Sequence, residues 1–141
     1  MKYTKATKAK DVRRAWHLVD VGGKILGRES TKIAQLLIGK GKPYFVPSLD
    51  CGDYVVIINA AKVALTGKKK ETKVYMRFSG YPGGLKVKTF ADVLIENPTR
   101  IIRESVAGML PQNKLKDKML KRLYIYADAN HPYAQKFKND N

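Results

Sequence analysis

Residues Tyr54–Ile58 read YVVII, an unbroken run of apolar and mostly β-branched side chains. A strand that alternates between a buried and a solvated face would show polar residues at every second position, and this run shows none. The stretch therefore predicts a strand buried on both faces, the kind of strand found in parallel sheets.

The segment before this strand predicts a strand and a helix. Residues 16–21 (WHLVDV) alternate enough for a strand that ends at two glycines, Gly22 and Gly23. Leu26–Ile38 then places apolar side chains along one side and polar ones along the other, which predicts an amphipathic helix ending at Gly39. Residues 39–53 contain two prolines and form a loop.

The segment after Tyr54–Ile58 predicts one short strand, three helices and a final strand. A short turn or helix follows Asn59, and Asn97-Pro98 separates the first two helices. The expected elements are a strand at Val74–Phe78, a helix capped by Thr89 and running to Glu96, a helix capped by Thr99 and extending to Met109, a basic helix at 113–121, and a strand at 123–126. The order β-α-β-(basic excursion)-α-α-α-β predicts an α/β fold with a largely parallel sheet.

The chain length indicates one domain. The sequence has 141 residues, of which 44% are hydrophobic, enough to build a core. We expect a single domain over 1–141, with a basic N-terminal arm at 1–14 and an extended C-terminal tail at 127–141.

Charge is the strongest compositional signal. There are 28 Lys and Arg against 12 Asp and Glu, a formal net charge of +16. Such a chain attracts polyanions, most often nucleic acid. A single cysteine, Cys51, rules out an intramolecular disulfide and fits a reducing compartment. The chain shows no secretory signal, no Arg/Ser-rich transit segment and no membrane-spanning apolar run, which favours the cytoplasm and no membrane partner.

Enzymatic, metal and cofactor sites have little support. Residues 22–27 (GGKILG) follow a strand and open a helix, as phosphate-binding loops do, but they match neither the Walker nor the dinucleotide spacing. Asp20, Asp50 and Asp53 could form a carboxylate cluster, although loop aspartates usually cap or turn the backbone. His17 is isolated, and Cys51 has no evident base. The sequence predicts no enzyme, no cofactor, no metal and no small-molecule substrate.

Basic residues gather in three separate segments. The first is the arm at 1–14. The second is 65–86, which holds six cations, three aromatic residues and four glycines against one acid, Glu71. The third is 114–122. The cations of the last two segments are Lys68, Lys69, Lys70, Lys73, Arg77 and Lys86, then Lys114, Lys116, Lys118, Lys121 and Arg122. Three such runs with few acids nearby predict a phosphate-binding surface.

Aromatic residues and glycines point to RNA. Tyr75, Phe78 and Tyr81 are interleaved with cations, and aromatic rings stack on unpaired bases. Gly80, with Gly83 and Gly84, lets the backbone bend and approach a ligand closely. A basic, aromatic, glycine-bent loop suits irregular RNA better than a regular DNA groove.

Three stretches resemble a known family. They are 52–69 (GDYVVIINAAKVALTGKK), 79–84 (SGYPGG) and 108–115 (GMLPQNKL), which together resemble the L-thirteen family of bacterial-type large-subunit ribosomal proteins. The resemblance covers about residues 14–135. Met76 and Phe78 depart from it, since the family usually has tyrosine and histidine there, and Asp128 replaces a usual glycine.

The resemblance implies a three-layer α/β fold, with a central, mainly parallel sheet flanked by helices. It implies a non-enzymatic protein that binds large-subunit ribosomal RNA, lies among neighbouring large-subunit proteins and joins early in assembly. It implies a main RNA-facing loop, a second contact and a tail contact. These comprise Lys68, Lys69, Tyr75, Arg77, Ser79, Gly80, Tyr81, Gly83 and Gly84, then Lys114 and Lys121, then His131.

The sequence leaves two alternatives. One is a nucleotide-dependent α/β transferase using residues 22–27. The other is a nucleic-acid-binding regulator that acts away from the ribosome.

Overall fold

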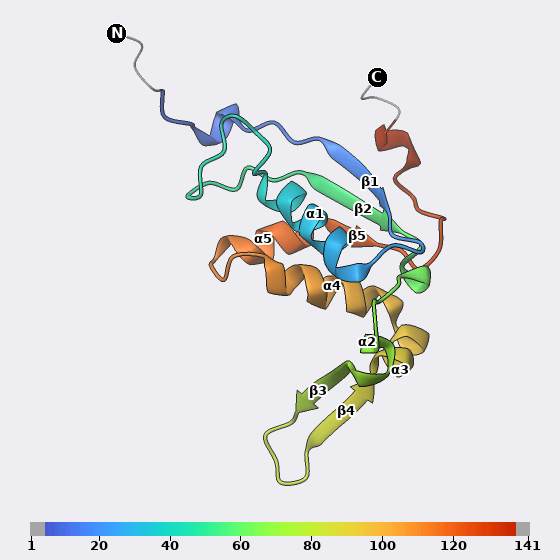
Figure 1. Ribbon diagram of the computed structural model, residues 1–141. Coiled ribbons are helices and arrows are strands. Elements are labelled where there is room, and N and C mark those ends of the chain that lie inside the picture. Colours follow the sequence, from blue (N-terminus) through green and yellow to red (C-terminus); the bar gives the residue numbers. More distant parts are fainter. Residues whose placement is uncertain (1–4, 138–141) are drawn as a thin grey trace.

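The computed structural model describes residues 5–137, and its centre is a three-stranded parallel sheet. The strands are β1 (Trp16–Asp20), β2 (Tyr54–Ile58) and β5 (Leu123–Ile125), in the order β1-β2-β5 (Figure 1). Both strand pairs are parallel, and Ile57 of β2 is in register with Val19 and Ile125. The YVVII run is the middle strand, and Val55, Val56 and Ile57 have no solvent exposure. The predicted α/β fold with a mainly parallel sheet is confirmed.

Helix α1 (Leu26–Ile38) connects β1 to β2 and has the bounds that its periodicity predicts. Its apolar side chains at Leu26, Ile33 and Leu37 are buried against the sheet. The helix ends at Gly39, whose φ of 85° lies in the left-handed region that glycine adopts without strain.

The connection from β2 to β5 contains one 3₁₀ turn and three helices of the body, besides the hairpin and α2 described below. These are the 3₁₀ turn η2 (Ala60–Lys62) and helices α3 (Phe90–Glu96), α4 (Pro98–Met109) and α5 (Leu115–Lys121). Helix α4 packs against α1, and Ile101, Ile102 and Val106 join the same core as Ile33. Both connections, β1 to β2 and β2 to β5, move to the next strand in the same direction across the sheet. Because connections between parallel strands are right-handed, both then place their helices on the same face of the sheet.

Two helix starts were predicted from side-chain caps, and one prediction was wrong. Thr89 caps α3, since its hydroxyl accepts a hydrogen bond from the Asp92 amide. Thr99 does not cap α4, which begins at Pro98 with Asn97 as its N-cap, two residues before the predicted cap. Proline fits the first helical position because the amide it lacks would have no partner in the helix.

The C-terminal tail covers the opposite face of the sheet. The Trp16 ring stacks on Tyr54 and on Tyr133, with ring centroids 4.4 and 5.2 Å apart. The 3₁₀ turn η3 (Ala134–Phe137) contacts β1, and its Phe137 meets Trp16 edge-on. The tail was predicted to be an extended arm, but its described part, 127–137, folds back as the third layer. Residues 138–141 lie outside the described residues.

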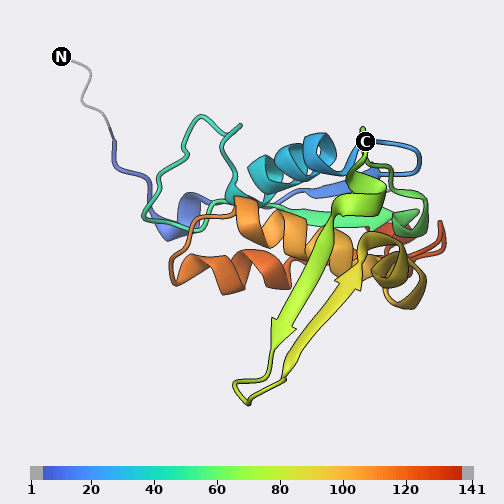
Figure 2. The same cartoon turned by 60° about the horizontal axis from the view of Figure 1, so that its bottom comes forward.

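A hairpin projects away from this body. The single-turn helix α2 (Lys69–Thr72) leads into β3 (Val74–Phe78), which pairs antiparallel with β4 (Leu85–Thr89). Figures 1 and 2, which differ by a 60° rotation, both show the hairpin extending beyond the sheet and helices. The predicted strand at Val74–Phe78 is confirmed, and β4 is an additional strand.

The N-terminal arm is held to the loop at 39–53. Two hydrogen bonds to Tyr44 flank its η1 turn (Ala9–Asp11), from the Thr7 hydroxyl to the Tyr44 carbonyl (3.0 Å) and from the Arg13 amide to the Tyr44 hydroxyl (3.2 Å). Residues 1–4 of the arm, including Lys2, lie outside the described residues. Within 5–137, no helix is long and apolar enough to cross a membrane.

Candidate nucleic-acid interface

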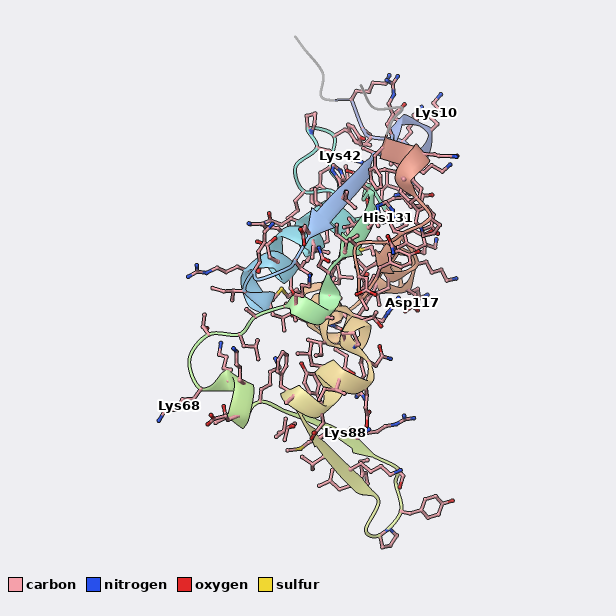
Figure 3. All side chains as sticks on the ribbon, turned by 90° about the vertical axis from the view of Figure 1, so that its right-hand side faces the viewer. Lys10, Lys42, Lys68, Lys88, Asp117 and His131 are labelled. Carbon is pink, nitrogen blue, oxygen red and sulfur yellow. The ribbon has the colours of Figure 1, made fainter. Side chains whose placement is uncertain are left out.

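Helix α2 and its N-cap residue, Lys68, present three consecutive lysines to solvent. Lys68, Lys69 and Lys70 are all exposed, and none forms an ion pair with another described residue. Lys68 points away from the body (Figure 3). Lys73, at the end of the turn, is partly buried, and its Nζ lies 5.7 Å from the centroid of the Tyr75 ring. The Lys68–Lys70 triplet is therefore free to meet phosphates.

The hairpin carries its cations on one face. Arg77 lies directly opposite Lys86 across the two strands, and Tyr75 lies opposite Lys88. Lys88 is neutralised by Glu96, at 2.5 Å from Oε2, whereas Arg77 and Lys86 form no ion pair with any described residue. Like charges that face each other across a hairpin repel. An anion placed between Arg77 and Lys86 would relieve that repulsion.

The hairpin turn depends on its glycines. Gly80 and Gly83 have φ angles of 88° and 71°, and a Cβ on Gly84 would lie 1.9 Å from the Ser79 hydroxyl. The turn is closed by the Ser79 amide, which donates to the Gly84 carbonyl, and by the Gly84 amide, which donates to the Tyr81 carbonyl. This geometry leaves the Tyr81 ring 76% exposed at the tip. The glycines therefore shape the turn that presents Tyr81.

Tyr75 is less accessible than the sequence suggests. Its ring packs against the core at the root of the hairpin. Burial, with the nearby Glu104 carboxylate, raises the pKa of the Tyr75 hydroxyl. Tyr75 therefore anchors the hairpin to the body, and Tyr81 is the ring of the turn that is open to stack on a base.

Helix α5 forms a separate basic surface. Lys114, Lys118 and Lys121 are exposed, and Lys116 is partly exposed, with its Nζ 2.9 Å from Oε1 of Gln112. Asp117 is the acid of this helix, and it pairs with no described cation. The structure brings these lysines together on one short element, apart from α2 and the hairpin (Figure 1).

Arg122 does not belong to this surface. The residue is buried, and its guanidinium forms a bidentate ion pair with Asp50, in which Nη2 lies 2.6 Å from Oδ1. It also donates to the carbonyls of Leu37 (3.2 Å), Asp53 (3.3 Å) and Lys118 (3.3 Å). Every part of the guanidinium fork is occupied inside the fold. Its prediction as an RNA contact is therefore corrected to a structural role.

His131 is also drawn into the fold. Its ring lies between Tyr126 and Phe137, with centroids 6.4 and 5.7 Å away. The Nδ1 atom is buried without a hydrogen-bond partner among the described residues. The imidazole therefore contributes to the packing of the tail, and it stays partly exposed.

Of the three aspartates considered as a carboxylate cluster, Asp50 and Asp53 serve as structural ion-pair partners, and Asp20 accepts hydrogen bonds from the Gly22 amide and the Asn59 side chain. Lys42 Nζ lies 2.5 Å from Oδ1 of Asp53, and His17 Nε2 lies 2.9 Å from Oδ2. Burial alone raises the pKa of Asp53, but hydrogen bonds from Lys42, the Ala15 amide and His17 outweigh it and hold that pKa below its ordinary value. The network holds the loop at 39–53 against β1.

Asp50 is held in the same way from the other side of that loop. Burial raises its pKa, but the hydrogen bond and charge of Arg122, with the charge of Arg14, lower it by more. Arg14 lies 3.5 Å from the Asp50 carboxylate and donates to the Gly52 carbonyl at 2.5 Å. Arg14, a cation of the basic arm, is thus partly committed to the fold. Within 5–137, no three His, Cys, Asp or Glu side chains form a group suited to a metal ion.

The glycine loop at 22–27 does not resemble a phosphate cradle. The Gly22 amide donates to the Asp20 carboxylate (2.9 Å), and the Gly23 amide donates to the Lys62 carbonyl (2.9 Å). The Leu26 amide, at the start of α1, donates to the Ala64 carbonyl at 2.9 Å. Phosphate-binding loops need such amides free to meet the ligand. Here internal partners occupy the amides of Gly22, Gly23 and Leu26.

One feature of the hairpin was missed in the sequence. Residues Leu85–Thr89 (LKVKT) alternate between apolar and polar side chains, which is the period of a half-exposed strand. Read with Val74–Phe78 across the glycine turn, this alternation would have predicted a hairpin with one basic and one apolar face.

Comparisons with known proteins agree on one family. Residues 14–132 match the family model described as Ribosomal protein L13. The chain is 50% identical to the large ribosomal subunit protein uL13 of Geobacter sp. (strain M21), over 93% of this chain and 92% of the relative. It is 52% identical to the uL13 protein of Thermotoga maritima, over 94% and 90%. It is 50% identical to that of Chloroflexus aggregans, over 90% and 89%.

Proposed function

The chain belongs to the ribosomal protein L13 family, and we propose that it is a structural constituent of the large ribosomal subunit that binds large-subunit ribosomal RNA. The proposal places the protein in the cytoplasm, among neighbouring subunit proteins, from an early stage of assembly. It assigns no catalysis to the chain, and it treats 1–141 as one ribosomal-protein domain.

One observation carries the RNA-binding part of this proposal. Lys68–Lys70, at the start of α2, and the Arg77–Lys86 pair of the hairpin lie on projecting elements, and none of these cations forms an ion pair with another described residue. Three cations around the loop at 39–53, Arg14, Lys42 and Arg122, are instead paired with Asp50 or Asp53. Uncompensated charge that is held away from the body can reach phosphates without disturbing the core.

The mechanism follows from this separation. The sheet and helices fix the direction of the hairpin, of α2 and of α5. Their lysines and arginines neutralise phosphates of RNA segments that would otherwise repel one another, and this releases condensed counterions. Tyr81 at the tip offers its ring to an unpaired base. Recognition then depends mainly on the shape of the RNA.

The test is a comparison of two triple variants of equal charge. Lys68→Gln/Lys69→Gln/Lys70→Gln should weaken binding to large-subunit RNA and reduce the slope of log affinity against log salt by about 2 to 3, roughly one for each lost phosphate contact. The control, Lys24→Gln/Arg28→Gln/Lys62→Gln, removes the same charge from exposed positions on the body.

The control should change affinity much less than the α2 variant. Equal losses in the two variants would mean that only net charge matters. No loss in the α2 variant, with folding retained, would refute its role. A wild-type chain that washes off large subunits at high salt would refute the proposed function as a whole.

A further inference from the structure

The second face of the hairpin is apolar and exposed. Met76 lies opposite Val87, and Phe78 lies opposite Leu85, so these four side chains point to the same side, with Val74 beside them. Their exposed fractions are 63% for Met76, 51% for Val87, 64% for Phe78, 56% for Leu85 and 41% for Val74. We call these five side chains the apolar hairpin face.

This face contrasts with the side of the hairpin that carries Arg77 and Lys86. Alternate residues of both strands face opposite sides, with Tyr75, Arg77, Lys86 and Lys88 on one side and the apolar hairpin face, together with Thr89 opposite Val74, on the other. The sheet and helices of the body do not cover the apolar hairpin face, because the hairpin projects beyond them (Figures 1 and 2). A contiguous apolar surface that a fold leaves uncovered marks an interaction site more often than an accident of packing.

RNA is a poor match for the apolar hairpin face. None of its five side chains is charged, so it cannot neutralise phosphate. None carries a polar N–H or O–H group, so the edges of a buried base would lose hydrogen bonds to water without gaining others. Only Phe78 offers a ring for stacking. The cations and the exposed Tyr81 ring lie instead on the other side and at the tip.

A second copy of the chain is also a poor match. Pairing two apolar hairpin faces would bring together two molecules that each carry a formal charge of +16. The repulsion between two such molecules opposes self-association. RNA bound to the Arg77–Lys86 side would neutralise part of this charge. Such RNA is available only in the subunit, so two free copies of the chain would still repel each other.

We propose that the apolar hairpin face docks on an uncharged, apolar surface of a neighbouring protein in the large subunit. The inference rests on the proposed function, because it needs RNA to hold the basic side of the same hairpin. The hairpin then lies between two partners of different chemistry, with phosphates on one side and aliphatic or aromatic protein side chains on the other. Phe78 and Met76 supply the two most exposed side chains of this contact.

Site-specific photocrosslinking separates the two sides of the hairpin. The photoreactive analogue benzoylphenylalanine would replace Phe78 in one full-length variant and Arg77 in a matched control, and both would be assembled into large subunits in cells. The Phe78 probe should crosslink to a protein of the subunit, and the Arg77 probe should crosslink to ribosomal RNA. A Phe78 crosslink to RNA or to a second copy, or no Phe78 crosslink when the control reacts, would overturn the inference.

Two further variants test the same inference by affinity. Phe78→Thr/Val87→Thr keeps strand propensity and should change binding to protein-free large-subunit RNA by less than about twofold, while reducing retention in salt-washed subunits roughly tenfold. Arg77→Gln/Lys86→Gln should weaken binding to the protein-free RNA. Equal loss of RNA affinity in both variants would overturn the inference but not the proposed function. A wild-type chain that binds neither RNA nor subunits would overturn both.

Discussion

A substitution of Arg122 tests whether this cation stabilises the fold or binds RNA, because the sequence alone would place it on the RNA-binding surface. Replacing it with methionine keeps much of the side-chain volume and removes the guanidinium. Asp50, whose side chain is only 12% exposed, then loses its bidentate partner, and the carbonyls of Leu37 and Asp53 lose a donor. Removing one partner of a buried ion pair typically costs about 3–5 kcal/mol. Arg14 also contacts Asp50, at 3.5 Å, so we expect the lower end, about 3 kcal/mol.

Urea unfolding followed by far-ultraviolet circular dichroism would measure this loss of stability, and the melting temperature should fall by roughly 10 °C. The control is Lys121→Met, an equal change of charge at the preceding, exposed position. It should leave stability within about 0.5 kcal/mol and weaken RNA binding modestly. An Arg122→Met variant that kept wild-type stability but lost RNA affinity would refute the structural assignment and restore the RNA contact.

Three other predictions address the loop at 39–53 and the tail. Asp53→Asn should make stability depend less on pH in the acid range. The pKa of Asp53 is lowered in the folded chain, so its carboxylate stabilises the fold above its ordinary pKa of 3.8, and this stabilisation is lost as pH falls through the folded pKa. Melting temperatures from pH 6 to pH 3 would measure the difference from the wild type. Tyr133→Ser removes the ring that stacks on one face of Trp16, the only tryptophan, and exposes that face to water. The fluorescence emission of Trp16 should therefore shift to longer wavelength, while the circular dichroism spectrum stays unchanged. Gly52→Ala should prevent stable folding, because its Cβ would lie 1.6 Å from a backbone oxygen of α1, whereas Gly41→Ala in the same loop has open space and should be nearly neutral; expression and thermal melting compare them.

The elements of the body were predictable because their signals are local. The bounds of α1 follow from its apolar periodicity and from Gly39, and the bounds of β2 follow from five consecutive apolar residues. Each pattern is complete within one segment and agrees with the burial that the fold requires. The parallel arrangement followed from the order of these elements, since strands separated by helices connect in that way.

The burial of Arg122 and the packing of the tail on the sheet were not predictable, because both depend on residues that are distant in the sequence. Arg122 is 72 residues from Asp50 and 85 from Leu37, and a lysine or arginine with no visible partner is ordinarily counted as surface. The tail contains Tyr133 and Phe137 without helical or strand periodicity, and it packs because Trp16 and Tyr54 present rings across the sheet. Neither contact leaves a periodic trace in the sequence.

The separation of charge has a consequence for the response to salt. The ion pairs of Asp50 and Asp53 are partly or largely buried, and salt screens buried pairs weakly. Lys68–Lys70 and the Arg77–Lys86 pair are exposed, so salt competes with their phosphate contacts directly. Raising the salt concentration should therefore weaken the affinity for isolated, protein-free RNA well before it loosens the body. If the RNA-binding cations also held the core together, salt would reduce RNA affinity and fold stability at the same time. Here the buried ion pairs stabilise the body and the exposed cations of α2 and the hairpin are proposed to bind phosphate, so the two properties should respond to salt separately.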